Sequence, residues 1–126
     1  MDNGADVTNI SMAAYTETSV VDEAIGRTVR HDAIVVAAAD DLGSIGLRQL
    51  AALPGVVGVA AVGPSGRLLA TSNHEADRSV NAPGARPTLR EVNHHIITTT
   101  SGGTWAACAV VSGLALLAAA VPDRIA

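Results

Sequence analysis

Aromatic residues are almost missing from this sequence. Trp105 and Tyr15 are the only two among 126 residues, and there is no Phe. Hydrophobic residues still make up 48% of the chain, so a core has to be built from Ala, Val, Ile and Leu. These small side chains bury little apolar area each, and buried apolar area is what stabilises a core. We therefore expect one domain of modest stability per residue.

Cysteine and positive charge are also scarce. Cys108 is the only cysteine, which excludes an internal disulfide and suits a reducing compartment. No basic leader segment precedes the acidic residues 1–6, so we expect no signal peptide, a frayed start at 1–6 and a cytoplasmic protein. The formal net charge of −4, without a basic run, argues against a nucleic-acid partner. The four histidines have no metal-ligand spacing with Cys108, so neither a metal nor another cofactor is expected.

One long apolar stretch, residues 105–121, raises the question of a membrane. Its length lies at the short limit of about 17–25 residues that a spanning helix needs. Its many Ala residues suit a helix packed closely on a sheet. We therefore predict a buried helix there and no membrane partner.

Hydrophobic patterning predicts an α/β fold with a mainly parallel sheet. Ser19–Arg30 has helical spacing of its apolar residues, with Ser19 as N-cap. Residues 33–39 and Val56–Val62 are continuous apolar runs of the kind that form strands buried on both faces. Shorter strands are predicted over residues 7–12 and 67–72. The order of strand, helix and buried strands gives the α/β class.

Six ordered blocks of the sequence resemble the second half of the subtilisin-like serine peptidases, the subtilases. The blocks are GADVTNISMA at 4–13, VVAAAD at 35–40, AALPGVVGVAAV at 51–62, TSN at 71–73, VNAPG at 80–84 and GTWAACAVVSG at 103–113. No single block is specific, but the ordered set is similar to that family over nearly the whole chain. The resemblance implies a truncated subtilisin-like domain over residues 7–126, with the N-terminal half of the family domain missing.

The departures from the family pattern concern catalysis. Subtilases use a Ser–His–Asp triad, and the resemblance puts the nucleophile position on Trp105, whose indole cannot attack an acyl group. It puts the oxyanion-stabilising Asn on Asp40, a carboxylate that would repel an oxyanion. The family's Asp and His belong to the half that has no counterpart here. We therefore expect no catalytic residues and a pseudopeptidase that binds a peptide or a partner subunit.

The resemblance also indicates where a peptide would bind. In subtilases the segment matching residues 9–13 pairs with the substrate backbone, and strand addition needs no triad. The predicted peptide-binding residues are Ile10, Ser11, Met12, Ala13, Ala14, Gly102, Gly103, Thr104 and Trp105. Without the missing half, the strand at 7–12 would keep an open edge, so we expect a homo-oligomer or a hetero-complex.

Other interpretations remain open at this stage. The stretch at 47–72 also suits a small regulatory dimerisation module of the roadblock type, and a split subtilase completed by a separate N-terminal half is a further alternative. Asp40 and Asp41 form either a cation site or, more simply, a solvated turn. Trp105 is either a core plug at a helix start or an aromatic floor for a peptide. Ser101 and the pair His94 and His95 are taken as exposed residues.

Overall fold

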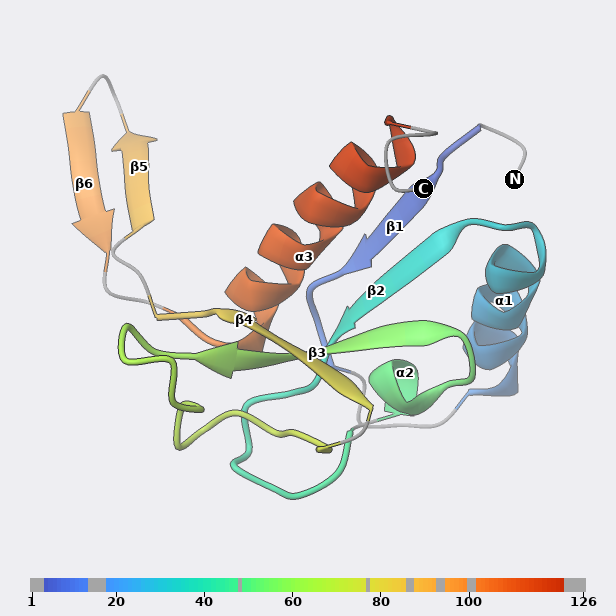
Figure 1. The fold of residues 1–126 in the computed structure, drawn as a ribbon, viewed down its shortest axis with the longest axis horizontal. Coiled ribbons are helices and arrows are strands. Elements are labelled where there is room, and N and C mark those ends of the chain that lie inside the picture. The colour runs from blue at the N-terminus through green and yellow to red at the C-terminus, as the bar shows by residue number, and fades with distance from the viewer. Residues whose placement is uncertain are drawn as a thin grey trace.

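The chain folds around a four-stranded sheet in which every strand is parallel to its neighbours (Figure 1). This computed structural model describes residues 4–13, 18–47, 49–76, 78–85, 88–92, 95–99 and 102–121. The sheet order follows the chain: β1 (Val7–Ile10), β2 (Ile34–Ala38), β3 (Val56–Val62) and β4 (Ser79–Pro83). The helices are α1 (Ser19–Arg30), α2 (Gln49–Ala52) and α3 (Thr104–Ala119), and the strands β5 (Thr88–Val92) and β6 (His95–Thr99) form a separate antiparallel hairpin.

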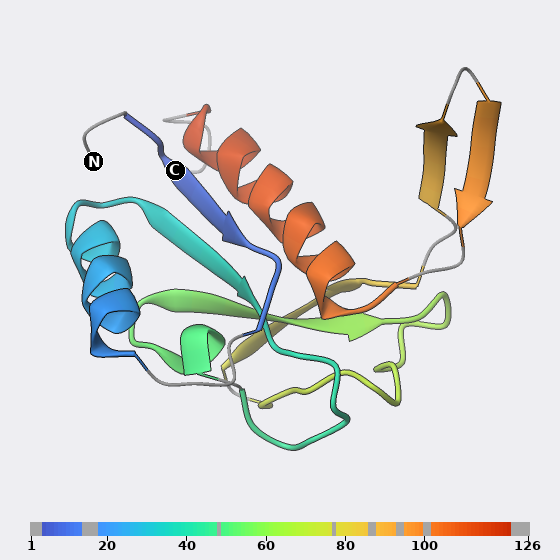
Figure 2. The ribbon, with the colours of Figure 1, turned by 180° about the vertical axis from the view of Figure 1, so that it is seen from behind.

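The sheet separates two cores. Val36 and Ala38 of β2 pack with Ala107 and Cys108 of α3 on one face. Residues from the same strand that point the other way, such as Val35, pack with α1 and α2. Figures 1 and 2 show this layering, with α3 on one side of the sheet and α1 and α2 on the other. β2 is buried on both faces, which explains its uninterrupted apolar sequence.

The predicted α/β class, with its mainly parallel sheet and flanking helices, is confirmed. Ser19–Arg30 and Val56–Val62 form the predicted helix and strand with the predicted bounds, but the N-cap of the helix is Thr18 and not the predicted Ser19. The strand predicted at 33–39 forms as Ile34–Ala38, and the one predicted at 7–12 ends at Ile10. The predicted frayed start is described only from Gly4 onward, and residues 1–3 lie outside the described part of the chain.

The strand predicted at 67–72 does not form. The turn at Gly63–Gly66 reverses the chain, and Leu68 makes only an isolated antiparallel bridge to Val62. The edge of β3 is instead taken by β4, which pairs with it in parallel along five residues. No strand was predicted for β4 because its residues, SVNAP, are neither strictly alternating nor continuously apolar.

No helix within the described residues is long and apolar enough to cross a membrane. The apolar stretch from residue 105 onward is instead α3, which lies across the sheet and contacts all four of its strands.

Candidate functional site

The start of α3 meets the loop that follows β2, at the end of the sheet where the parallel strands finish. Both oxygens of the Asp41 carboxylate lie on Thr104, the first residue of α3. Oδ1 accepts a hydrogen bond from the Thr104 backbone N–H at 2.9 Å, and Oδ2 accepts one from the Thr104 hydroxyl at 3.2 Å. The partial positive charge of a helix N-terminus favours a carboxylate at this place. The Asp41 carboxylate therefore supplies the negative charge that stabilises the N-terminus of α3.

Gly103 makes this contact possible. A Cβ on that residue would lie 2.5 Å from Asp41 Oδ2, so any larger side chain would push the carboxylate away. The Gly103 N–H donates to the carbonyl of Gly84 at 2.9 Å, and a Cβ on Gly84 would lie 2.6 Å from the Gly103 carbonyl oxygen. The two glycines hold the end of β4 against the start of α3, which is why the APG and GTW blocks come together.

Asp40 behaves differently from its neighbour. Its residue is 7% exposed, and its backbone has the left-handed φ of 85°, which turns the side chain back into its own loop. Oδ1 accepts the N–H of Asp41 at 2.8 Å, and Oδ2 has no hydrogen-bond partner among the described residues. The carboxylate that contacts the helix start is thus that of Asp41, and Asp40 holds the loop. Neither residue lies in the solvated turn that the sequence suggested.

Asn73 holds the same loop in place through hydrogen bonds. It is fully buried, and its side-chain oxygen accepts the N–H groups of Leu42 at 3.1 Å and Ser44 at 2.9 Å. Its own backbone N–H donates to the Asp40 carbonyl at 2.8 Å. In the sequence, Asn73 stands out only as part of the TSN block, and no pattern there indicates its hydrogen bonds to the loop.

Ser11 and Trp105 are brought together from opposite ends of the chain. The Ser11 hydroxyl donates to the backbone carbonyl of Trp105 at 2.9 Å, across 94 residues of sequence. Trp105 is 41% exposed, so it forms part of the surface and does not fill the core. Of the other residues predicted around it, Met12 and Gly102 are exposed and Ala13 is half-buried, whereas Gly103 and Thr104 are buried. Ala14 lies outside the described residues.

A polar cluster lies just behind Ser11, between β1 and α3. The Asn9 side-chain oxygen accepts hydrogen bonds from the Ser112 hydroxyl at 2.8 Å and from the Cys108 thiol at 3.1 Å. Burial raises the pKa of the Cys108 thiol, against the smaller opposing effect of its hydrogen bonds with Ser11, the Ile10 backbone and Ser112. Cys108 is therefore a neutral donor in the core, not a nucleophile.

An apolar groove opens beside Met12 on the α1 face of the sheet. It has a volume of about 430 Å³ and is lined by Ile10, Met12, Val20, Val21, Ala24, Ile25, Thr28 and Leu50. Met12 and Val20 are among the most exposed large apolar side chains of the described residues. Met12, the residue after Ser11, borders this groove, so the groove offers a place for an apolar side chain close to Ser11.

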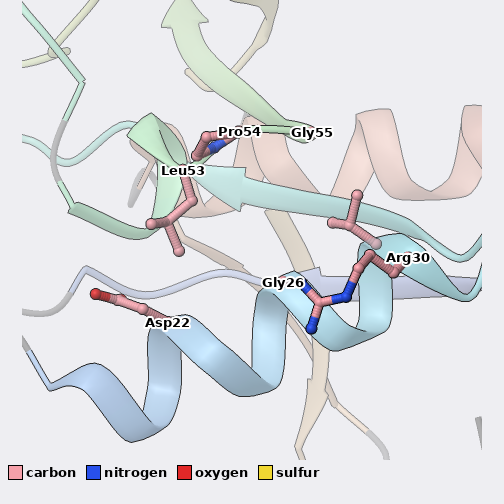
Figure 3. Close-up of a pocket in the computed structure, with 7 residues that line it drawn as sticks. Asp22, Gly26, Arg30, Leu53, Pro54 and Gly55 are labelled. Carbon is pink, nitrogen blue, oxygen red and sulfur yellow. The ribbon is translucent and has the colours of Figure 1, made fainter.

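A second hollow, of about 470 Å³, lies away from this surface. It sits between α1 and the turn before β3, and Figure 3 shows Asp22 and Arg30 at its two ends with Gly26 between them. None of the residues predicted to bind a peptide lines it. Within the described ranges, no three His, Cys, Asp or Glu side chains lie close enough to hold a metal ion. Ser101 and His94 fall outside the described residues.

Comparisons with known proteins agree with this geometry. No protein-family model matches the chain. It is 32% identical over 125 residues to the thermophilic serine proteinase of Bacillus sp. (strain AK1), covering 94% of this chain and 29% of that protein. Its fold is similar to the prenylagaramide maturation protease PagA (TM-score 0.77, 27% identity, 93% of this chain, 45% of that one). It is also similar to the patellamide maturation protease PatA (TM-score 0.78, 30% identity, 92% and 45%). The chain thus spans less than half the length of these relatives.

Proposed function

Because this chain is homologous to the subtilisin-like serine proteases, we propose that it is a non-catalytic relative, a pseudopeptidase that binds an extended peptide or partner chain. The observation that carries this proposal is the contact of Asp41 with Thr104, directly beside Trp105. A serine peptidase needs a nucleophile at this helix start and hydrogen-bond donors facing the developing oxyanion. Here residue 105 at the helix start is a tryptophan, and the carboxylate of Asp41 is bound to the neighbouring Thr104.

The resident carboxylate opposes acyl transfer in two ways. It uses the N–H and hydroxyl of Thr104, two donors at the helix start. It also sets a negative charge beside the place where an oxyanion would form, and losing even one oxyanion donor lowers the rate by about 10²–10³. An alcohol introduced at residue 105 would meet the same charge. Binding, in contrast, requires no negative charge to develop.

The peptide-binding part of the proposal rests on the surface around Ser11. An extended peptide can pair with main-chain groups there and direct alternate side chains to either side. One side holds the exposed indole of Trp105, and the other holds the apolar groove beside Met12. We therefore assign the bound class as an extended segment that carries at least one large apolar side chain. Aromatic surfaces such as Trp105 commonly anchor such segments.

The first test addresses catalysis. The purified chain is incubated with a fluorophosphonate probe and analysed by intact-mass spectrometry, alongside a fluorogenic peptide assay. We expect no labelled serine and no cleavage. Stoichiometric labelling of a serine would overturn the non-catalytic assignment and favour an active, split subtilase.

The second test addresses binding, with the emission of Trp105, the chain's only tryptophan, as the reporter. End-blocked hexapeptides with a central Leu are titrated against matched peptides with a central Asp. We expect saturable binding of the Leu series alone. Ser11→Pro, which removes one backbone donor, should abolish binding, whereas Ser11→Ala, which keeps that N–H, should retain it. Equal binding by both variants, with unchanged circular dichroism, would refute the docking site, as would no saturation with either peptide series.

A further inference from the structure

Within the described residues, no strand pairs with the outer edge of β1. Among the described strands, β1 pairs only with β2 and is the first strand of the sheet order. The N–H of Ile34 donates to the carbonyl of Asp6 at 2.9 Å. Because successive residues of a strand face opposite edges, the backbone groups of Thr8 also face β2, and those of Val7 and Asn9 face outward. Open strand edges of this kind readily pair with another chain.

The surface next to this edge is the uncharged second half of α3. Residues 104–121 contain no charged side chain. Val110, Leu114, Leu116, Leu117 and Val121 are each between 43% and 65% exposed. A surface helix normally has a polar outer face, so an apolar outer face indicates an interaction surface.

Edge and helix form one continuous surface. A groove of about 420 Å³ lies between them, with Val7 and Asn9 on one wall and Ser112, Gly113 and Leu116 on the other. Figures 1 and 2 both show the last turns of α3 running alongside the first residues of β1. An ideal Cβ at Gly113 would have no atom within 4 Å, so the helix is open to close approach at this point.

We propose that this surface is the contact of a two-fold symmetric dimer of the chain. A two-fold axis perpendicular to the sheet pairs two β1 strands antiparallel and puts both α3 helices on the same face. Such an interface is self-complementary, because each copy offers the other an open edge and an apolar helix. α3 itself brings no charged side chain to the contact, and Asp6 is the one charged residue among those that line the groove.

The extent of the surface fits a pair of this kind. The helix from Val110 to Ala119 runs for about 15 Å at 1.5 Å per residue, beside the four-residue edge of β1. Stable interfaces bury about 800 Å² on each partner, so the contact requires the helix face as well as the strand edge. Neither Ser11 nor Trp105 lines the groove, so the dimer and the proposed peptide binding are tested through different residues.

The test measures the mass of the full chain by light scattering after size exclusion, across the micromolar range. We expect the dimer mass for the wild type and the monomer mass for Leu116→Glu, which puts a charge on each side of the contact. Ile45→Glu is the matched control, because Ile45 is 89% exposed in a loop and lies outside this surface. It should remain dimeric.

A strand-specific readout completes the test. Val7→Pro removes an outward N–H without touching the ladder to β2, so it should raise the dissociation constant at least tenfold. The amides of Val7 and Asn9 should also exchange slowly in the dimer and quickly in the Leu116→Glu monomer. A wild type that is monomeric or polymeric, a dimeric Leu116→Glu variant, or unprotected Val7 and Asn9 amides in the dimer would each overturn the proposal.

Discussion

Asp41 and Thr104, separated by 63 residues of sequence, are joined by both oxygens of one carboxylate. The contact locks the loop after β2 onto the first turn of α3. It therefore has two consequences that can be measured separately, one for stability and one for reactivity. Both follow from placing a full negative charge at a helix N-terminus.

Asp41→Ala should destabilise the fold by about 1–3 kcal/mol, the range for losing charge-assisted hydrogen bonds at a helix start. Asp41→Asn should cost less, since the amide oxygen can still accept from Thr104. Urea unfolding followed by circular dichroism gives both values. Glu23→Ala is the control: its pair with Arg27 is exposed on α1, and such pairs contribute about 0.3–0.5 kcal/mol. Equal effects of Asp41→Ala and Glu23→Ala would contradict the role given to Asp41.

Trp105→Ser should not create a peptidase. The new hydroxyl would stand beside the Asp41 carboxylate, and a serine requires an aligned base and oxyanion donors before it becomes a nucleophile. Fluorophosphonate labelling and peptide hydrolysis of this variant should both stay at background. A labelled Ser at residue 105 would show that the remaining groups at the helix start suffice for catalysis.

Gly84→Ala should destabilise the chain by about 1–3 kcal/mol through overpacking. Its Cβ would lie 2.5 Å from the Ala61 methyl group and 2.6 Å from the Gly103 carbonyl, and neither neighbour is a flexible side chain. Gly26→Ala in α1 is the opposite case, because its Cβ would meet only the tip of Arg30 at 3.3 Å. That change should stabilise the helix by about 0.5–1 kcal/mol. Thermal unfolding of the two variants should shift in opposite directions.

Periodicity was sufficient to predict the central elements of this fold. α1 has an apolar stripe at helical spacing, and β2 and β3 are apolar on both faces because α3 covers one face and α1 and α2 cover the other. β4 was not predicted because it contains Asn81 and Pro83 and most of its residues are exposed. The segment at 67–72 has a strand-like sequence. It follows a tight turn, and its only pairing is the isolated bridge between Leu68 and Val62.

The site could be predicted only in outline. The resemblance to subtilases put Ser11 and Trp105 in one site, and the structure joins them by a hydrogen bond. The packing of Gly84 against Gly103 was not predicted. The left-handed φ of Asp40 decides which of the two adjacent aspartates contacts α3. A sequence pattern does not predict that backbone angle. The role of Asn73 depends on two loop N–H groups that come close only after folding.

Cys108 gives a prediction for the dependence of stability on pH. Burial raises the pKa of its thiol above the ordinary value of 9.0, so the folded state keeps the neutral form where the unfolded state has begun to ionise. Below about pH 9 both states are neutral, and this residue contributes no pH dependence. Above that pH the unfolded thiol loses its proton first, so the free energy of unfolding should fall as the pH rises.

Urea unfolding of the wild type and of Cys108→Ala, each measured from neutral pH to pH 10 or so, isolates this contribution. The variant is less stable at neutral pH because it loses buried contacts, but it should lose less stability across the alkaline range, since other titrating groups are common to both proteins. Ellman's reagent should also react with Cys108 only after unfolding, because the thiol is fully buried. Parallel pH curves, or fast labelling of the native chain, would show that the thiol ionises as readily in the fold as outside it.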